Sequence, residues 1–236
     1  MTPISSGNTT RVSVHSIGTE ANSLSTNPSI SADGRYITFI SFATNLVSGD
    51  TNSTWDVFVH DLQTGTTMRV SVDSSGVDGN GFSGGPSISG DGRFVAFQSS
   101  ATNLVTGDTN EKVDIFVHDM QTGTTERVSV HSSGVEGDSL SDGSSISADG
   151  RYVAFNSQAT NLVPGDTNGT IDVFVHDRQT GTTTRVSVHS SGTQADGNGS
   201  SASSISGDGR YITFISDATN LVANDTNARG DIFVHD

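Results

Sequence analysis

The sequence predicts an all-β fold, a four-bladed β-propeller with four antiparallel strands in each blade. Three observations lead to this prediction: a unit of 58 residues occurs four times, each unit holds four short strand patterns, and turn-forming residues are abundant. Glycine contributes 27 of the 236 residues and hydrophobic residues only 31%, a mixture that suits short strands and tight turns better than helices. We therefore expect a single domain over residues 1–236.

Two arginine positions define the repeat. One arginine precedes Val-Ser-Val with spacings of 58, 58 and 58 residues, and a second follows Asp-Gly with spacings of 58, 58 and 59, the extra residue lying in the loop around 194–196. The two sets are Arg11, Arg69, Arg127 and Arg185, and Arg35, Arg93, Arg151 and Arg210. A fixed period of this length is typical of propellers and solenoids. A solenoid would show atypical capping repeats, and none is visible, so the pattern favours a propeller.

The first unit shows how strands are expected to fill one period. We predict strands a to d over Ser29–Ser31, Tyr36–Ile40, Asp56–His60 and Arg69–Val72. An Asp-Gly pair between strands a and b is typical of a two-residue hairpin turn. Strand c carries apolar residues on both faces, which predicts that it lies buried between neighbouring blades.

The two ends of the sequence predict how the ring closes. The chain begins with a lone copy of strand d at Arg11–Val14 and ends at Asp236, after the fourth copy of strand c. We expect this N-terminal strand to complete the last blade, because closure protects the sheet edges. The prediction implies a monomer of 24.4 kDa. The alternative is that two chains pool their blades into one larger ring.

Two phrases in each unit resemble a known repeat. In the first unit they are Ser-Ala-Asp-Gly-Arg-Tyr-Ile-Thr-Phe-Ile-Ser at 31–41 and Asp-Val-Phe-Val-His-Asp-Leu-Gln-Thr-Gly at 56–65, and they resemble the TolB-type, WD-like propeller repeat. The resemblance covers essentially the whole chain and implies the fold, whereas such propellers serve many functions. Two features depart from it: residues 43–52 lengthen the b–c loop, and four blades are fewer than the family generally uses.

The b–c loop carries candidate calcium ligands, because each unit holds the pattern Asp-x-Asn-x-x-x-Asp. Calcium prefers oxygen ligands from short Asp and Asn side chains and from carbonyl groups. The candidate ligands are Asp50, Asn52, Asp56, Asp108, Asn110, Asp114, Asp166, Asn168, Asp172, Asp225, Asn227 and Asp231. Two residues after each Asn stand Thr54, Lys112, Thr170 and Arg229, so carbonyls or water would have to complete the shell. The alternative is that these side chains only cap turns.

The d–a loop, which links one blade to the next, is a candidate ligand rim around one mouth of the channel. Its polar positions are Glu20, Asn22, Asp78, Asn80, Glu136, Asp138, Asp196 and Asn198. These loops vary in composition, which is how a constant scaffold carries specificity. The alternative is a set of solvated turns.

The other recurrent polar residues are predicted to be structural. His60, His118, His176 and His235 end strand c, where we expect packed, hydrogen-bonded residues and no metal-binding ring. Arginines of both sets are expected to pair with the carboxylates of the Asp33 and Asp61 type. Gly81–Gly85 matches G-x-S-x-G, but a nucleophile elbow requires a following helix. No catalytic set breaks the four-fold pattern, so no enzyme is predicted.

Composition narrows the function. Eleven basic against 26 acidic residues give a net charge of −15, which disfavours nucleic acid as a partner. No apolar stretch is long enough for a membrane span, and the N-terminus has no signal-peptide pattern. We predict a non-enzymatic binding or scaffold module for protein or carbohydrate, extracellular or at a bacterial cell surface, with calcium as the candidate cofactor. The alternatives are a propeller hydrolase or lyase with acidic residues at the channel mouth, and an architectural slice of a larger surface protein.

Overall fold

The computed structural model describes residues 7–227 and 229–236, and every regular element within them is a β-strand. Fifteen strands form four antiparallel sheets, which we name blade 1 (β1–β4), blade 2 (β5–β8), blade 3 (β9–β12) and blade 4 (β13–β15). The strands are β1 Ser25–Ile30, β2 Tyr36–Ser41, β3 Asp56–Asp61, β4 Thr66–Arg69, β5 Ser83–Ile88, β6 Phe94–Ser99, β7 Asp114–Asp119, β8 Thr124–Arg127, β9 Ser141–Ile146, β10 Tyr152–Ser157, β11 Asp172–Asp177, β12 Thr182–Arg185, β13 Ser200–Ile205, β14 Ile212–Ser216 and β15 Asp231–His235.

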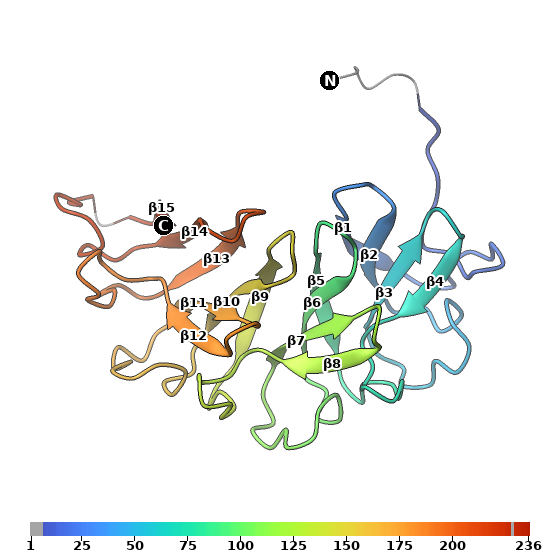
Figure 1. Ribbon diagram of the computed structural model, residues 1–236, viewed down its shortest axis with the longest axis horizontal. Helices are drawn as coiled ribbons and strands as arrows, with labels where there is room; N and C mark the ends of the chain where they lie inside the picture. The colour runs from blue at the N-terminus through green and yellow to red at the C-terminus, as the bar shows by residue number, and fades with distance from the viewer. Residues whose placement is uncertain (1–6, 228) are drawn as a thin grey trace.

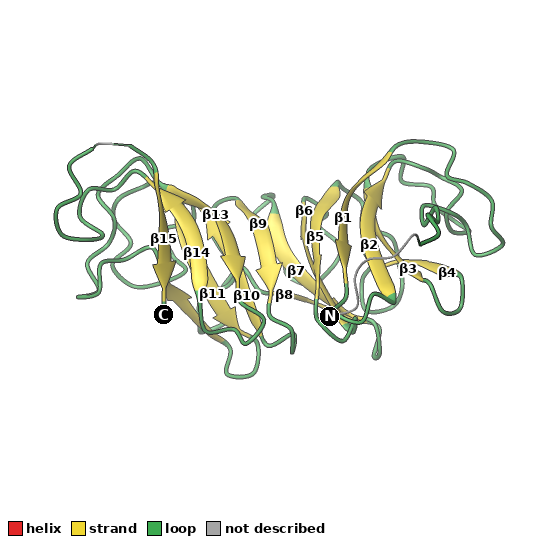
Figure 2. Cartoon of the chain, turned by 90° about the horizontal axis from the view of Figure 1, so that it is seen from above, coloured by secondary structure: helices red, strands yellow, loops and turns green. Residues whose placement is uncertain are grey.

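The four blades follow one another in an open arc, with blade 1 at one end and blade 4 at the other (Figures 1 and 2). The first strands of successive blades contact each other, β1 with β5, β5 with β9 and β9 with β13, so the first strand is the inner strand of each blade. This arrangement confirms the all-β, bladed architecture predicted from the repeat. The predicted closure is not seen: the described part of blade 4 has three strands, and the arc stays open.

The core lies within each blade and between neighbours. Phe39 of β2 faces Phe58 of β3 with ring centroids 5.8 Å apart, and each of the other blades has the equivalent stack. Val57 and Val59 pack against Ile88 of the next blade and are 0% exposed, as predicted for a strand with apolar residues on both faces. The b–c loops are fixed by four buried leucines, Leu46, Leu104, Leu162 and Leu221.

The fourth strand was misplaced by the sequence pattern, which favoured Arg69–Val72, whereas the strand is Thr66–Arg69. Arg69 pairs with Phe58 at the end of the ladder. One further backbone bond follows, from Val70 N to Val57 O, and then the Ser71 side chain takes over by accepting a hydrogen bond from Val57 N. The Val-Ser-Val residues are therefore buried at the end of the blade and do not form its fourth strand.

The inner strand is longer than predicted, Ser25–Ile30 in place of Ser29–Ser31, and it is bulged in every blade. The bulge residues all have positive φ: Asn27 (52°), Gly85 (57°), Gly143 (64°) and Ala202 (55°). A bulge leaves a residue outside the ladder and bends the strand. Backbone polar groups are thus released from pairing at the inner edge of each blade.

The N-terminal segment lies on blade 1. Arg11–Val14 forms no strand, and Val14 makes a single bridge to Glu20. Thr67 N donates to Ser16 Oγ at 3.0 Å, and Thr67 Oγ1 donates to Val14 O. The linkers that follow blades 1 and 2 make the same contacts with the next blade, through Ser74 and Thr125 and through Ser132 and Thr183. Residues 11–22 therefore sit on blade 1 in the way that an inter-blade linker does.

Candidate functional site

The acidic residues of the b–c loop surround an arginine in blades 1 to 3. In blade 2, Arg127 Nη1 lies 3.2 Å from Asp108 Oδ1, 3.4 Å from Asp114 Oδ2 and 2.8 Å from Glu136 Oε2, and the Arg127 side chain is only 9% exposed. We name this group the arginine–carboxylate cluster. The equivalent clusters are Arg69 with Asp50, Asp56 and Asp78, and Arg185 with Asp166 and Asp172. A guanidinium thus occupies the space between the predicted calcium ligands.

Local hydrogen bonds hold the carboxylates in place. Asp114 accepts from Ser129 Oγ at 2.5 Å and from Asn110 Nδ2 at 2.9 Å. Asn110 Nδ2 also donates to Gly137 O in the d–a loop, and its Oδ1 accepts from Lys112 N at 2.8 Å. The asparagine therefore caps a turn and joins two loops, as the turn-capping alternative expects.

The cluster is buried and incompletely hydrogen-bonded. Burial raises the pKa of Asp108 above its ordinary value, and the Arg127 charge lowers it only in part. Burial likewise raises the pKa of Asp114 despite its bonds to Ser129 and Asn110. Asp108 Oδ1 and Arg127 Nε are buried without a hydrogen-bond partner, so the 3.2 Å contact of Asp108 with the guanidinium is ionic only. Removing one charge from such a buried network lowers the stability of the fold strongly, because the remaining charge is left buried without a partner.

These contacts bear on the calcium prediction without testing it. In the described residues no group of three or more Asp, Glu, His or Cys side chains is arranged to hold a metal ion. In blades 1 to 3 an ion would have to displace the guanidinium. Calcium binding stays a prediction.

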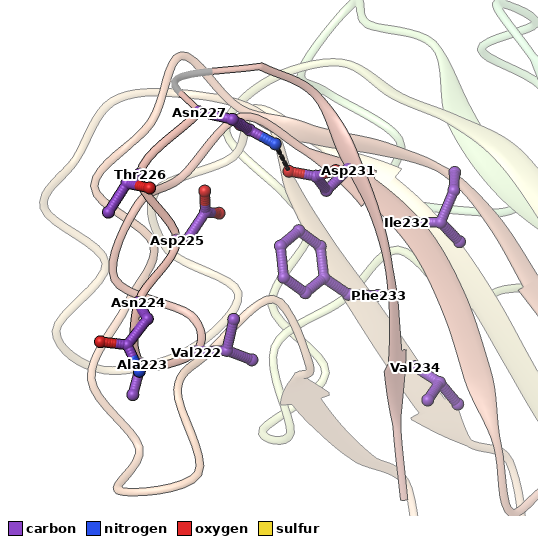
Figure 3. A pocket seen from close by; sticks show the side chains of 10 residues that line it. All are labelled: Val222, Ala223, Asn224, Asp225, Thr226, Asn227, Asp231, Ile232, Phe233 and Val234. Carbon is purple, nitrogen blue, oxygen red and sulfur yellow. Dashed lines mark hydrogen bonds between the residues drawn. The ribbon is translucent and has the colours of Figure 1, made fainter.

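In blade 4 the same carboxylates form no ion pair within the described residues, although Arg229 lies in the same loop. Asp225, Asn227 and Asp231 line a groove of about 530 Å³ along the free edge of β15, and Asn227 Nδ2 donates to Asp231 Oδ2 at 2.9 Å (Figure 3). Ile232 and Val234 are 71% and 66% exposed, whereas the equivalent Val57 and Val59 are 0% exposed. The groove lies where the fourth strand packs in the other blades.

The predicted ligand-rim residues fasten each d–a loop to the next blade. Asn80 accepts from Thr102 N and donates to Thr102 Oγ1 at 3.0 Å, and its own amide donates to Asn103 Oδ1 at 2.9 Å. Asn22, Asp138 and Asp196 make the corresponding bonds with the b–c loops that follow them, and Asn198 binds Asp217. Asp78, Glu136 and Glu20 instead contact the arginines of the Arg69 type. Ligand binding by these eight residues stays a prediction.

The fourth d–a loop aligns differently from the sequence-based alignment. Gln194 bridges to Val188, as Asp78 bridges to Val72, and Asp196 N donates to Asn220 Oδ1, as Asn80 N does to Asn103 Oδ1. The additional residue therefore follows Asp196. Because a glutamine stands where the other units have Asp or Glu, Arg185 has two carboxylate partners in the described chain and Arg127 has three.

The second arginine set pairs as predicted. Arg35 donates from Nε and Nη2 to the two oxygens of Asp61, at 2.9 and 2.7 Å, and stacks 4.7 Å from the centre of the Tyr36 ring. The bond from Arg35 lowers the pKa of Asp61. Asp33 instead caps the hairpin turn through Arg35 N at 3.0 Å. The partners expected for the Arg69 type were wrong, because those arginines contact the b–c and d–a carboxylates.

Three of the four strand-end histidines, His60, His118 and His176, are buried, as predicted, whereas His235 of β15 is only partly buried. His118 Nδ1 lies 2.9 Å from Thr125 Oγ1, and burial lowers the histidine's pKa. His60 and His176 make the same contact with Thr67 and Thr183. These residues therefore link strands c and d.

The comparisons with known proteins support the fold. No family model matches the sequence, and no curated protein matches it. Among solved structures, TolB from Acinetobacter baumannii is 20% identical with a TM-score of 0.52, over 91% of this chain and 41% of that one. A putative TolB from Agrobacterium tumefaciens is 19% identical (TM-score 0.50, 90% and 58%). The β-propeller domain of the Trilobed protease from Pyrococcus furiosus is 14% identical (TM-score 0.53, 92% and 56%).

The chain is thus similar to TolB-type β-propellers, as the repeat phrases implied, and spans 41–58% of the length of these structures. At such identities the likeness concerns the fold. In addition, no helix in the described ranges has the length and apolar character needed to cross a bilayer.

Proposed function

We propose that this chain is a non-enzymatic binding or scaffold module that recognises a protein or a carbohydrate, in an extracellular or cell-surface setting. In blades 1 to 3 the recurrent charged residues are paired within the chain, in the clusters of the Arg127 type and the pairs of the Arg35 type. The residues that vary between blades include those of the inner strands and d–a loops. A constant structural framework that carries variable surface residues is expected of a protein that recognises a ligand.

The inner-strand bulge is the observation that carries this proposal. It recurs in all four blades, and Asn27, Gly143 and Ala202 are exposed there. Bulged residues carry backbone groups that the ladder does not use; those of Gly143 bond Gln98 Oε1 and Ser203 Oγ of the two neighbouring blades. Neighbouring side chains are mostly small and polar, as in Ser-Asp-Gly-Ser of β9 and Ser-Ser-Ala-Ser of β13. Four such edges side by side suit a polar ligand bound through several weak contacts.

A glycan array and a protein capture experiment test this function. Full-length tagged protein is applied to both, with calcium and with a chelator. We expect selective binding that Ala202→Arg abolishes, because a long cation at the inner edge covers the bulge. Met68→Lys, at an exposed position of the outer strand β4, is the matched control and should bind normally.

Turnover of polyuronate or peptide substrates by the same protein, without selective binding, would instead favour the hydrolase or lyase alternative. Binding that is unchanged in Ala202→Arg would remove the inner strands from the proposal.

Calcium stabilisation is proposed for blade 4, where Asp225 and Asp231 form no ion pair in the described chain and Asp231 accepts a hydrogen bond from Asn227. Calcium should raise the melting temperature of dilute protein more than magnesium at equal ionic strength, because magnesium demands stricter octahedral geometry. Asp225→Asn should remove the difference, whereas Asp166→Asn, in a cluster that holds Arg185, should keep it. Equal effects of the two ions would leave only turn capping.

Completion of blade 4 by an Arg11–Val14 segment is also retained as a proposal, with the segment of a second copy in place of the chain's own, because residues 11–22 lie on blade 1. This segment has the Arg-Val-Ser-Val sequence that follows β-strand c in blades 1 to 3. In that position Arg11 would face Asp225 and Asp231 as Arg127 faces Asp108 and Asp114.

A further inference from the structure

We propose that the open end of blade 4 binds blade 1 of a second copy of this chain, head to tail, with the second copy's N-terminal segment completing blade 4. The contacts that join consecutive blades within the chain define this interface. In the described chain, one side of each contact has no partner at blade 4, and the complementary side has no partner at blade 1.

The first pair of halves is apolar. Between blades, an aromatic ring of one blade covers the hairpin glycine of the next, Tyr36 over Gly92 and Tyr152 over Gly209, so closely that a Cβ would overlap the ring. At the ends of the arc, Tyr211 is 39% exposed and Gly34 has nothing within 4 Å of its Cβ position. The Tyr211 ring and the Gly34 backbone are therefore both exposed at the ends of the arc.

The strand faces beside them show the same pattern. Ile30 of β1 is 60% exposed, whereas the equivalent Ile88 and Ile146 are 7% exposed because the preceding blade covers them. On blade 4, Ile232 and Val234 are uncovered in the way described above. Burial of these residues against each other repeats the packing between Val57, Val59 and Ile88, and apolar burial is the main driving force of association.

The second pair of halves is a backbone hydrogen bond. Ala32 N donates to Gly90 O, Gly90 N to Ala148 O, and Ala148 N to Gly207 O, at 2.9–3.0 Å. This series leaves the Gly207 amide at the blade 4 end and the Ala32 carbonyl at the blade 1 end. A second copy in the same relation would join them.

The third pair of halves is ionic. Arg11 and Glu20 form an ion pair with side chains 61% and 69% exposed, and they correspond to Arg127 and Glu136 of the buried cluster. Asp225 and Asp231 provide the other half on blade 4. Charge complementarity of this kind fixes the register of an interface.

The position of the N-terminal segment explains why the occupant is a second copy. Residues 11–22 are fastened to blade 1 through Ser16, Val14 and Asn22, and blade 1 lies at the opposite end of the arc from β15 (Figure 1). The segment contacts blade 1 as the linkers with Ser74 and Ser132 contact blades 2 and 3. Blade 4 of another copy has the sheet edge that fits it, and pairing would cover this edge.

A heterologous interface of this kind closes into a ring or extends into a filament. The smallest closed product is a two-copy ring of eight blades. Sedimentation of the full chain over a dilution series is expected to show a species of twice 24.4 kDa. A larger species would support the same interface with a different number of copies, provided that the variants below abolish it.

Two variants with opposite ends blocked give the decisive test. The first carries Ile232→Lys and Val234→Lys, and the second carries Arg11→Glu and Ile30→Lys, all at exposed positions. Each alone should associate at least about 30-fold more weakly than the unaltered chain. An equimolar mixture should form a 1:1 complex, because each variant keeps the half that the other has lost.

Val135→Lys is the control and should assemble normally. Unchanged circular dichroism of each variant would show that the blades remain folded. A chain that stays monomeric at all concentrations overturns the proposal. So does an assembly that survives both pairs of substitutions, or a mixture of the two variants that does not associate.

Discussion

Replacing Arg127 by methionine is expected to lower the free energy of unfolding by about 3–5 kcal/mol, because it leaves buried carboxylates without their counter-ion. Asp108 and Asp114 are 2% and 0% exposed at their side chains, and both contact the same guanidinium nitrogen. Methionine keeps much of the side-chain volume, so the loss reports charge more than packing. Urea unfolding of the full chain, followed by circular dichroism, measures the change.

Arg210→Met is the control. Arg210 belongs to the other arginine set, and its side chain and that of its partner Asp236 are 60% and 54% exposed. Solvent screens an exposed pair, so its contribution is small. A loss as large in Arg210→Met as in Arg127→Met would contradict the distinction between buried clusters and exposed pairs.

The effect of Arg127→Met should also depend on pH. Burial raises the pKa of Asp108 and Asp114 in the folded chain, and removing the guanidinium takes away a group that lowers it. A carboxyl group with a raised folded pKa opposes folding above that pKa, and the penalty disappears once pH falls below the unfolded value. The difference between the variant and the unaltered chain should therefore be largest near neutral pH and shrink toward about pH 4. A difference that grows on acidification would contradict this account.

Strand c was predicted correctly from the sequence because its residue types alone indicate that it is buried. Val57, Phe58 and Val59 are apolar on both faces, and only a position between two blades buries both. Strand d was misplaced because Val70 and Val72 alternate with a serine, as strand residues do. These two valines are buried at the end of the blade and not within its fourth strand. The true strand, Thr66–Arg69, has no alternating apolar pattern that would identify it.

The candidate site was predictable only in part. One loop carries Asp108, Asn110 and Asp114, so the sequence alone places them together. The entry of Arg127 between them depends on the pairing of Arg127 with Phe116 across β7 and β8, and spacing along the chain does not reveal that side chain's direction. One signal was available: every unit that has the acidic pattern also has an arginine at a fixed position before Val-Ser-Val.

The contacts between blades should give the second large effect, through Gly150→Ala. Gly150 has φ of 72°, and a Cβ there would overlap the ring of Phe94 on blade 2. Gly123 also has φ of 72° but has nothing within 4 Å of its Cβ position, so Gly123→Ala isolates the backbone strain of about 1–2 kcal/mol. Gly150→Ala adds the cost of forcing two packed blades apart, about 1–3 kcal/mol more.

A double-mutant cycle separates these two costs. Phe94→Ala removes the ring that Gly150→Ala would strike, so the glycine substitution should cost no more in that background than Gly123→Ala costs in the unaltered chain. The coupling between positions 94 and 150 then equals the steric part of the effect. Equal losses from Gly150→Ala with and without the Phe94 ring would show that the ring does not rest on the glycine. The proposed contact of Tyr211 in one copy with Gly34 in another would then lose its basis.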